Sequence, residues 1–536
     1  MFWADELAAS LSGAQVLNDS KTPSGTVHVG SLRGPVINDV IVRAMRARGL
    51  PATFLYGVDD LDPMDAQALL TPDAVEQAMG RPLAHVADPE EDGHDSYARH
   101  FAGLFLGTFA RLGVHPDRVY WMSEVYAAGE MDRYIRIALD RAAAVRDIYQ
   151  RVANVRHPDD WHPLSAICEN CGRIGTTIVT AWDGERVHYE CRPDLVAWAK
   201  GCGRTGDVSP FGGRAKLPFN VDWAAKWSLF GVTIEPNGKD LGTKGGARDR
   251  SEAIAREVFE REPPVNVVYE FLNIGGRRMS TSKGRGAAAH LVAEVMPPEQ
   301  LRLLFLRPRY NQAIDFDPEG TDAVPRVFDE SDRLAAAVAG REFKGEVPAD
   351  PEHVFAASQV DPAADTAAEA ASYRPSFAHL AMLVQVPGVD VAERVAAEKG
   401  EPLSERELAI LDERSTAARR WLETYAPDQA RMAVQAELPT SAVADLDPET
   451  LRFLRELSNW AEREAPVSGE AWQALIFNVA KLREPPLPPG AAFRAIYSAF
   501  LGRPNGPRAG WLLASLEPSF VIRRLDEAGS ASTLPA

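Results

Sequence analysis

The sequence predicts an α/β protein built on a doubly wound parallel sheet and extended by an all-α C-terminal region. Three observations support this fold class. Short apolar runs alternate with helical patterns up to position 296, a cysteine- and glycine-rich stretch interrupts the alternation, and strand-like patterns end near Pro297. A chain of 536 residues is long enough for several domains, each with its own core.

The opening segment is expected to form a strand, a glycine-containing turn, a helix and a second strand, after which the alternation continues. Strands are expected at residues 14–17, 52–58, 118–122, 232–234 and 265–274, and helices at 32–48, 96–112, 130–151 and 247–262. This order is typical of sheets that bind ligands at the carboxyl ends of their strands. We expect the two halves of the sheet domain in residues 1–156 and 217–296, an insertion in 157–216, a helical junction in 297–345 and an α-helical domain in 346–536.

The charge of the chain argues against a protein that coats nucleic acid. Its 58 basic and 76 acidic residues give a formal net charge of −18, so any contact with nucleic acid must come from local basic patches. The sequence contains neither an apolar run of ~18 residues nor a basic leader followed by an apolar stretch. We therefore expect a cytoplasmic protein without a membrane span.

The four cysteines lie close together and predict a metal site. Cys168, Cys171, Cys191 and Cys202 are too few for a disulfide framework, and the first two have the spacing of a zinc knuckle. Four thiolates form a closed tetrahedral Zn²⁺ site that leaves no position for catalysis, so the metal would be structural. His188 could replace Cys191 as a ligand, and free buried cysteines are the alternative to any metal.

Two loops could bind a polyphosphate. Residues 22–31 (Thr-Pro-Ser-Gly-Thr-Val-His-Val-Gly-Ser) join a strand to a helix, where glycines, backbone N–H groups and a histidine can meet phosphoryl oxygens. Residues 277–285 (Arg-Arg-Met-Ser-Thr-Ser-Lys-Gly-Arg) combine four cations with hydroxyl groups, which suits a loop that closes over a triphosphate. A tight capped turn and a solvated surface loop are the respective alternatives.

Together, the two loops resemble the His-Ile-Gly-His and Lys-Met-Ser-Lys-Ser signatures of class I aminoacyl-tRNA synthetases. The pattern Pro-Ser-Gly-x-x-His-x-Gly at 23–30 and the cysteine insertion are similar to those of class I lysyl-tRNA synthetases. The resemblance continues through residues 222–227, 235–240 and 269–271 and covers most of the chain. It implies a Rossmann-type catalytic domain with a zinc-binding insertion, followed by an α-helical anticodon-binding cage.

The resemblance also implies site residues. Catalysis is expected to depend on His28, Ser31 and Lys283. ATP, with Mg²⁺, is expected at Pro23, Ser24, Gly25, His28, Gly30, Arg278, Met279, Ser280, Ser282 and Lys283. Six positions depart from the family's pattern: Ser31 stands for a histidine, Arg278 and Thr281 for lysines, Phe219 for a tryptophan, Asn220 for an arginine and Leu241 for a histidine. The last two changes concern the substrate pocket more than the fold.

A bound lysine side chain needs an acidic or carbonyl partner, because a buried ammonium without one is too costly. Asp59 and Asp60 end the strand at 52–58 and are the candidates for this contact, although such carboxylates can instead cap the next helix. The rest of the amino acid is expected to contact Gly25, Trp223, Trp227 and Tyr269, of which the three aromatic residues could instead be plain core.

The helical C-terminal region is expected to contact tRNA. An exposed aromatic side chain flanked by cations can stack on splayed bases, and Arg508 with Trp511 fits that description best. Because the chain is acidic overall, cations at 277–285, 302–309 and 503–508 are expected to face the RNA.

The resemblance implies a monomeric enzyme that converts L-lysine and Mg-ATP to lysyl-adenylate and transfers lysine to the 3′-terminal adenosine of tRNA(Lys). One alternative is another class I synthetase, of glutamyl type, which a pocket rich in arginine would favour. A small-molecule adenylyltransferase is a second alternative, and the helical C-terminal region argues against it. The third is a paralogue that binds tRNA without catalysis.

Overall fold

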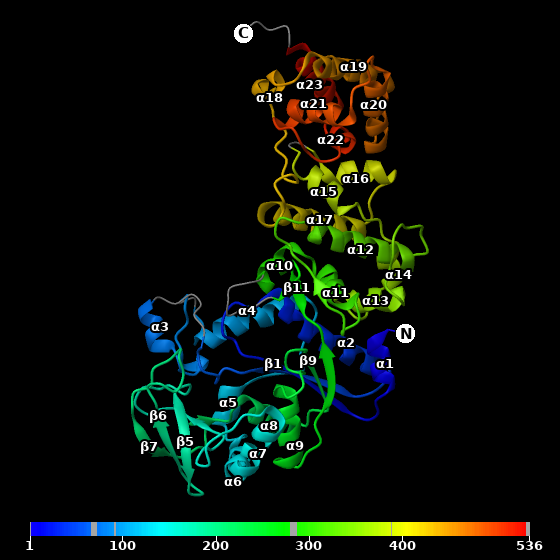
Figure 1. The fold of residues 1–536 in the computed structure, drawn as a ribbon. Helices are drawn as coiled ribbons and strands as arrows, with labels where there is room; N and C mark the ends of the chain where they lie inside the picture. Colours follow the sequence, from blue (N-terminus) through cyan, green and yellow to red (C-terminus); the bar gives the residue numbers. More distant parts are fainter. Residues whose placement is uncertain (1, 66–71, 91–92, 279–286, 387–388, 532–536) are drawn as a thin grey trace. The chain divides into compact units, whose positions relative to one another are not determined.

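The structure is a computed structural model that describes residues 2–65, 72–90, 93–278, 287–386 and 389–531. The chain forms two compact units (Figure 1). The first comprises Met1–Ala293, Pro298–Phe316 and Val347–Thr366, and the second comprises Glu294–Pro297, Asp317–Glu346 and Ala367–Ala536. Among the described helices, none combines the length and the apolar character that a bilayer crossing requires.

The first unit is built on a parallel sheet with the strand order β10-β9-β1-β2-β3. Its strands are β1 (Gln15–Lys21), β2 (Ala52–Val58), β3 (Arg118–Trp121), β9 (Ile234–Gly238) and β10 (Val265–Tyr269). From β1 the chain builds the sheet outward through β2 and β3, and later returns to the other side of β1 with β9 and β10. The doubly wound fold is therefore confirmed. The order reverses between β1 and β9, the position at which such sheets bind ligands.

Helices connect the strands of this unit. They are α1 (Trp3–Ala9), η1 (Val29–Leu32), α2 (Arg33–Ala47), α3 (Pro72–Ala78), η2 (Leu83–His85), α4 (Tyr97–Arg111), α5 (Met122–Ala127), α6 (Asp132–Asp140), α7 (Ala142–Ala153), α8 (Phe219–Phe230), α9 (Ala247–Glu257), α10 (Ala289–Val295), α11 (Pro298–Leu306) and α13 (Pro351–Ser358). The predicted helix at 130–151 is divided into α6 and α7, because Arg141 between them leaves the helical conformation with φ −107° and ψ 25°. A second small sheet has the order β12-β11-β13, formed by β11 (Leu272–Ile274), β12 (Arg277–Arg278) and β13 (Ile314–Asp315).

The cysteine-rich insertion is an antiparallel structure of its own. Its strands are β4 (Ser165–Ala166), β5 (Thr177–Trp182), β6 (Val187–Cys191), β7 (Thr205–Val208) and β8 (Ala215–Lys216), paired as β5-β6-β7 and β4-β8. Alternate residues of β6 point inward, and Val187, Tyr189 and Cys191 join the apolar core that also contains α8. The insertion is therefore packed against the sheet domain.

The described elements that follow β13 are all helical. In the second unit they are α12 (Ala323–Val338), α14 (Thr366–Ala371), α15 (Phe377–Leu383), α16 (Val391–Lys399), α17 (Glu405–Thr424), α18 (Thr440–Ala444), α19 (Pro448–Glu464), α20 (Gly469–Leu482), α21 (Pro489–Leu501), α22 (Ala509–Ser515) and α23 (Pro518–Ser530). A capping box between Ser404 and Glu407 begins α17, the longest of them. The predicted all-α C-terminal region is thus confirmed.

One of the cations expected to face RNA is instead buried. Arg302 on α11 is fully inaccessible, and its Nη2 lies 2.8 Å from the Asp39 carboxylate on α2. Its guanidinium also donates to the carbonyl oxygens of Ala357 and Leu112. The expectation for Arg302 was therefore wrong, because this cation joins α2, α11 and α13 within the first unit.

Candidate active site

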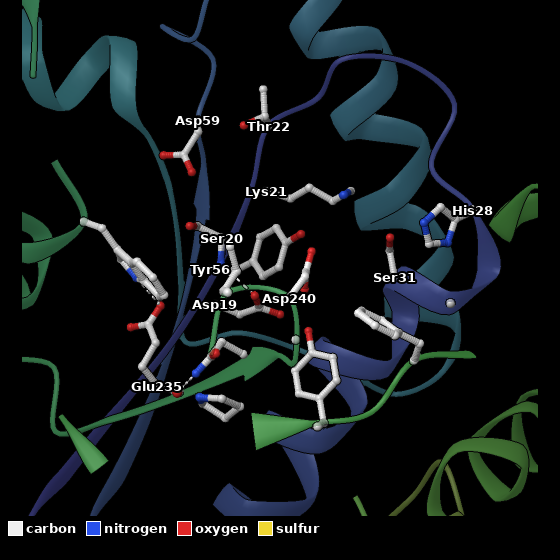
Figure 2. Close-up of a pocket in the computed structure, with 18 of the residues that line it drawn as sticks. Asp19, Ser20, Lys21, Thr22, His28, Ser31, Tyr56, Asp59, Glu235 and Asp240 are labelled. Carbon is white, nitrogen blue, oxygen red and sulfur yellow. Dashed lines mark hydrogen bonds between the residues drawn. The ribbon is translucent and has the colours of Figure 1, made fainter. Parts of the chain in front are cut away.

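A cavity of about 410 Å³ lies at the carboxyl ends of β1 and β9, where the strand order reverses. Its lining comprises Asp19, Ser20, Lys21, Thr22, Ser24, His28, Gly30, Ser31, Tyr56, Asp59, Phe219, Trp223, Glu235, Pro236, Asn237, Gly238, Asp240, Leu241, Tyr269, Glu270, Phe271 and Leu272. Figure 2 shows His28 and Ser31 on one side of the cavity and Glu235 on the other, with Asp19 and Asp240 between them. The cavity therefore has a loop side suited to phosphate and an acidic side.

The acidic side begins with the last residues of β1. The strand continues to Lys21, four residues beyond the predicted end, and this places Asp19 and Lys21 in the cavity. Burial, and then the nearby Glu235 carboxylate, raise the pKa of Asp19 to about 7. Burial also lowers the pKa of Lys21, although Asp19 and Asp240 oppose that shift. Sequence reasoning missed Asp19, because a polar run after a short apolar segment was interpreted as loop.

Glu235 on β9 is held by the two tryptophans that were expected to contact substrate. The indole nitrogens of Trp223 and Trp227 each donate to its carboxylate at 3.1 Å, and Asn18 on β1 donates at 3.1 Å. Burial raises the pKa of Glu235 to about 7. Trp223 lines the cavity, whereas Trp227 lies behind the carboxylate and is not part of the lining. Trp227 therefore influences the cavity through its hydrogen bond to the Glu235 carboxylate.

Asp59 lines the cavity but already has a cationic partner within the chain. The Lys226 ammonium on α8 lies 2.7 Å from Asp59 Oδ1 and 3.5 Å from Asp222 Oδ2. Burial favours the neutral acid, but Lys226 and Lys216 hold the pKa of Asp59 below its usual value. Asp59 is thus part of a buried ion network at the floor of the cavity.

Asp60 lies outside the cavity lining. Its carboxylate accepts hydrogen bonds from the backbone N–H of Ser123 at 2.8 Å and from the Ser123 hydroxyl at 2.5 Å. Since α5 begins at Met122, this is a capping interaction, and burial raises the pKa of Asp60 to about 6. The placement of Asp60 at the substrate is corrected here, because its carboxylate serves the first turn of α5.

The loop side of the cavity is formed by residues 22–31. Ser24, His28, Gly30 and Ser31 line the cavity, whereas Pro23 and Gly25 do not. Gly25 has a φ of +152°, which side chains rarely adopt, so the turn itself requires glycine there. Because His28 precedes η1 and α2, their backbone N–H groups follow directly after the histidine.

The first loop pairs with the segment that follows the second predicted loop. The backbone N–H of Val29 donates to the Ala287 carbonyl, that of Ala289 donates to the Val27 carbonyl, and His28 bridges to Ala288. On the other flank, Arg278 pairs with Asn273 between β12 and β11. Met279, Ser280, Thr281, Ser282 and Lys283 lie outside the described residues. Among the described residues, the segment that begins at Ala287 is therefore the part next to the second loop that contacts the first loop.

Tyr269, Phe219 and Trp223 give the cavity aromatic walls. The rings of Phe219 and Trp223 are stacked, with centroids 5.5 Å apart. Tyr269 ends β10, and burial, together with Asp19, raises the pKa of its hydroxyl. A Cβ atom at Gly34 on α2 would lie 2.6 Å from Asp19 Oδ2 and 2.9 Å from the Tyr269 hydroxyl. Glycine at position 34 is therefore what lets α2 approach these two groups.

Leu241 and Asn220, the two departures from the family's pattern that concern the substrate pocket, differ in whether they line the cavity. Leu241 lines the cavity, so an apolar side chain faces it at the position where the resemblance predicts an imidazole. Asn220 is buried at the start of α8, and its amide donates to the Ala247 carbonyl at 3.0 Å, tying α8 to α9. Asn220 is outside the cavity lining and has a structural role.

The four cysteines of the insertion converge, and their Sγ atoms all lie within 4.8 Å of one another. The Sγ atoms of Cys168 and Cys202 are 3.6 Å apart, and those of Cys171 and Cys191 are 3.7 Å apart. These distances are too long for disulfide bonds and short enough for the four thiols to share one metal ion. The His188 ring nitrogen Nδ1 instead lies 3.0 Å from Asp207. The described residues thus favour four thiolates over a set that includes His188.

Arg508 and Trp511 lie in the second unit and are in contact. The Arg508 guanidinium carbon is 5.2 Å from the centre of the Trp511 ring, and Arg508 is exposed. Both residues line a second cavity, between α20, α21 and α22. The structure thus places the two predicted RNA-binding residues together at a hollow.

Residues 1–359 match the family model described as tRNA synthetases class I (K). The chain is 32% identical over 550 residues to a lysine–tRNA ligase of Methanosarcina barkeri, covering 99% of this chain and 98% of that protein. It is 33% identical over 541 residues to a lysine–tRNA ligase of Archaeoglobus fulgidus, covering 98% and 100%. A lysine–tRNA ligase of Thermoplasma volcanium is 32% identical over 531 residues, covering 98% of each chain.

Proposed function

The chain belongs to the class I lysyl-tRNA synthetase family, and we propose that the cavity at the carboxyl ends of β1 and β9 binds L-lysine and Mg-ATP for a lysine–tRNA ligase reaction. The lysine carboxylate attacks the α-phosphorus of ATP, lysyl-adenylate forms and pyrophosphate leaves. The 3′-terminal adenosine of tRNA(Lys) then accepts the lysyl group and AMP leaves. No covalent bond to the enzyme is required.

The charge of the cavity is the observation that supports lysine. Five carboxylates line it, of which Asp59 is neutralised by Lys226 and Glu270 by Lys239, whose Nζ lies 2.5 Å from Glu270 Oε1. Three further carboxylates, Asp19, Glu235 and Asp240, line the cavity beside one further lysine, Lys21. A lysine molecule carries one ammonium group more than an amino acid with a neutral side chain, so an acidic lining favours it. Among the described residues, no arginine lines the cavity, which argues against a glutamyl enzyme.

We assign the acidic partners of the substrate to Asp19 and Glu235 in place of Asp60. Both carboxyls are buried and have pKa values raised to about 7, which is the state of an acid that lacks its cation. An ammonium group placed between them would favour their ionised forms. Trp223 and Tyr269 would then contact the aliphatic stem of the substrate.

The two predicted loops would bind the phosphate groups of ATP. His28 and the N–H groups after Gly30 would meet the oxygens of the α-phosphate, and the Ser31 hydroxyl could donate beside them. Arg278 and Lys283 would neutralise the leaving pyrophosphate. Mg²⁺ would accompany the ATP, supplying further positive charge at the phosphates.

Amino-acid-dependent exchange of pyrophosphate into ATP tests this function. With tRNA(Lys) present, we expect exchange with lysine and not with the other nineteen amino acids. Lys283→Ala should lower the rate well over tenfold, since contacts to developing charge are worth about 2–4 kcal/mol. Lys344→Ala, an exposed lysine of the second unit, is the matched control and should leave the rate unchanged. Exchange with glutamate alone would contradict the assignment of lysine. No exchange with any amino acid would refute the catalytic assignment.

We also propose that the four cysteines bind one structural Zn²⁺. Their converging thiols offer a complete tetrahedral set within one insertion. Metal analysis of the purified protein should find about one zinc per chain, and Cys191→Ser should lose the zinc and lower the melting temperature of the protein. His188→Ala is the control, and it should keep the metal because His188 pairs with Asp207. A metal-free wild-type protein that is fully folded would refute the site.

We further propose a monomeric protein of the cytoplasm. The described lining of the cavity lies within the first compact unit. The cysteines are all free thiols in the structure, as expected in a reducing compartment, where ATP and tRNA are also available.

A further inference from the structure

Lys21, the last residue of β1, is a cation in the cavity to which the proposed aminoacylation mechanism gives no role. Among the described residues that line the cavity, it is the only lysine or arginine. It also precedes the signature pattern that starts at Pro23, so the resemblance to the family does not account for it. The position of this ammonium group therefore needs an explanation of its own.

Neighbouring elements hold the backbone and the stem of Lys21. In the register of β1 and β2 it pairs with Val58, and its carbonyl oxygen accepts from the backbone N–H of Asp59 at 3.0 Å. Lys21 also lines a small apolar hollow together with Val58 and Phe105. Apolar walls suit the methylene groups of lysine, so the stem is supported while the ammonium group reaches the main cavity.

The ammonium group of Lys21 lies between the acidic side and the loop side of the cavity. Figure 2 shows the side chain extending toward the side that holds His28 and Ser31. In the proposed reaction, the amino acid occupies the acidic side and the phosphates of ATP occupy the loop side. The attacking carboxylate and the α-phosphate must therefore meet in the region that this ammonium group faces.

No carboxylate in the described part of the chain neutralises this ammonium group directly. Asp19 and Asp240 favour its charged form, but neither forms an ion pair with it within the described residues. Burial outweighs both and lowers the pKa of Lys21 below its ordinary value. A cation whose charged form is disfavoured in this way gains from an anionic ligand. Lys226 is different, because its ammonium group lies 2.7 Å from Asp59 Oδ1 and is already paired.

The chemistry at this point of the cavity requires positive charge. The carboxylate of lysine and the α-phosphate of ATP are both anionic, so they repel each other as the new oxygen–phosphorus bond forms. Negative charge then builds on the non-bridging oxygens of that phosphorus until pyrophosphate leaves. A cation at those oxygens stabilises the transition state more than the ground state, which raises kcat.

We propose that Lys21 is a catalytic residue of amino-acid activation, whose ammonium group binds a non-bridging oxygen of the α-phosphate and stabilises the charge that develops there. The lysine carboxylate oxygen bonds to the α-phosphorus, the bond from that phosphorus to the pyrophosphate oxygen breaks, and its electron pair leaves with pyrophosphate. Lys21 keeps its proton throughout, so it acts as a charge and not as an acid. The proposal rests on the proposed function, since it takes ATP and lysine as substrates.

Pyrophosphate exchange by Lys21→Met and Lys21→Gln tests this role. Both changes remove the charge, and each should lower kcat about 100-fold, the size expected for losing one donor to a developing anion. The KM for lysine should rise no more than about threefold, because the substrate ammonium is assigned to Asp19 and Glu235. Lys344→Met, at an exposed lysine of the second unit, is the matched control and should leave kcat unchanged.

A binding measurement separates contact with the phosphate from an effect on folding. AMP carries the α-phosphate and adenosine lacks it, so equilibrium dialysis with the two labelled ligands isolates this group. Lys21→Met should weaken binding of AMP about tenfold or more, the value of a hydrogen bond between charged groups. Binding of adenosine should stay unchanged, which also shows that the cavity is folded.

Asp240→Asn distinguishes a catalytic cation from a counter-ion of the chain. If Lys21 only neutralised Asp240, Lys21→Met would cost little once that carboxylate is removed. We expect Lys21→Met to lower kcat by the same factor of about 100 in the Asp240→Asn background as in wild type.

Four outcomes would each overturn the proposal. They are an unchanged kcat in both neutral variants, a loss confined to the KM for lysine, equal losses of AMP and adenosine binding, and no further loss in the Asp240→Asn background. Failure of the proposed function gives a different result, because wild type would then exchange no pyrophosphate with lysine. The comparison of AMP with adenosine would still report whether Lys21 contacts the phosphate.

Discussion

Asp19→Asn should reduce kcat/KM for lysine about 100-fold or more in pyrophosphate exchange, while making the folded protein more stable above pH 7. The amide has the shape of the carboxylate but cannot neutralise an ammonium group in a buried site. Removing one member of a buried charge pair costs about 3–5 kcal/mol, which corresponds to at least a 100-fold change. The loss should appear mainly in the KM for lysine and much less in the KM for ATP.

The stability gain follows from the direction of the pKa shift. Burial raises the pKa of Asp19 to about 7 from the ordinary value of 3.8, so the native state holds a proton that the unfolded chain releases. Stability therefore falls as pH rises from about 4 to 7, by about 1.4 kcal/mol for each pKa unit. The Asp19→Asn side chain cannot ionise, so the variant does not lose this stability as the pH rises. Urea unfolding at pH 5 and pH 8 should show a stabilising effect that is larger at pH 8.

Asp60→Asn is the matched control for Asp19→Asn. Asp60 is also buried and its pKa is also raised, to about 6, but its carboxylate caps α5 outside the cavity. Its substitution should leave the KM for lysine within about twofold of wild type. The wild-type KM for lysine should also rise as pH falls below about 7, because protonated Asp19 and Glu235 cannot pair with ammonium. Equal effects of the two substitutions on the KM would contradict the assignment of Asp19.

The contrast between Asp19 and Asp60 shows where sequence reasoning succeeded and where it stopped. Alternating apolar runs predicted the sheet and its binding edge, because the period of the apolar residues and the alternation of strands with helices can be recognised locally in the sequence. The pairing of β1 with β9 brings Asn18 to Glu235, 217 positions apart, and no local pattern encodes such a contact. The last residues of β1 are polar and line the cavity, so a criterion based on apolar runs ended the strand before these residues.

The prediction for Asp59 failed in a different way. Its position at the end of β2 was correct, and it does line the cavity, but its cationic partner lies on α8, which the sequence places 167 residues away. The Asp59 carboxylate, which the sequence suggested as a partner for the substrate's ammonium group, is thus already paired with the ammonium group of Lys226. The aromatic residues show the same limit: sequence alone could not separate Trp223, which lines the cavity, from Trp227, which orients Glu235 from behind.

Lys226→Met should destabilise the protein by about 3–5 kcal/mol, because it leaves the buried carboxylates of Asp59 and Asp222 without this cation. Both side chains of the Lys226–Asp59 pair are almost inaccessible, at 1% and 6% exposure, so water cannot replace the ammonium. The raised pKa of Lys226 and the lowered pKa of Asp59 mean that the pair stays ionised through the neutral range. Its contribution is lost only at high pH, when Lys226 deprotonates, or at low pH, when Asp59 is protonated. Urea unfolding should therefore show the deficit undiminished from pH 6 to pH 9.

Two further variants distinguish a buried network from an ordinary ion pair. Lys239→Met removes the other lysine that neutralises a cavity carboxylate, but Lys239 is 56% exposed, so this change should cost no more than about 1 kcal/mol. Lys226→Met combined with Asp59→Asn removes both charges and should recover a large part of the lost stability, because the penalty arises from the carboxylate left behind. If the double variant is as unstable as Lys226→Met alone, the packing of the lysine stem carries the effect. Asp59 would then be available to a substrate ammonium after all.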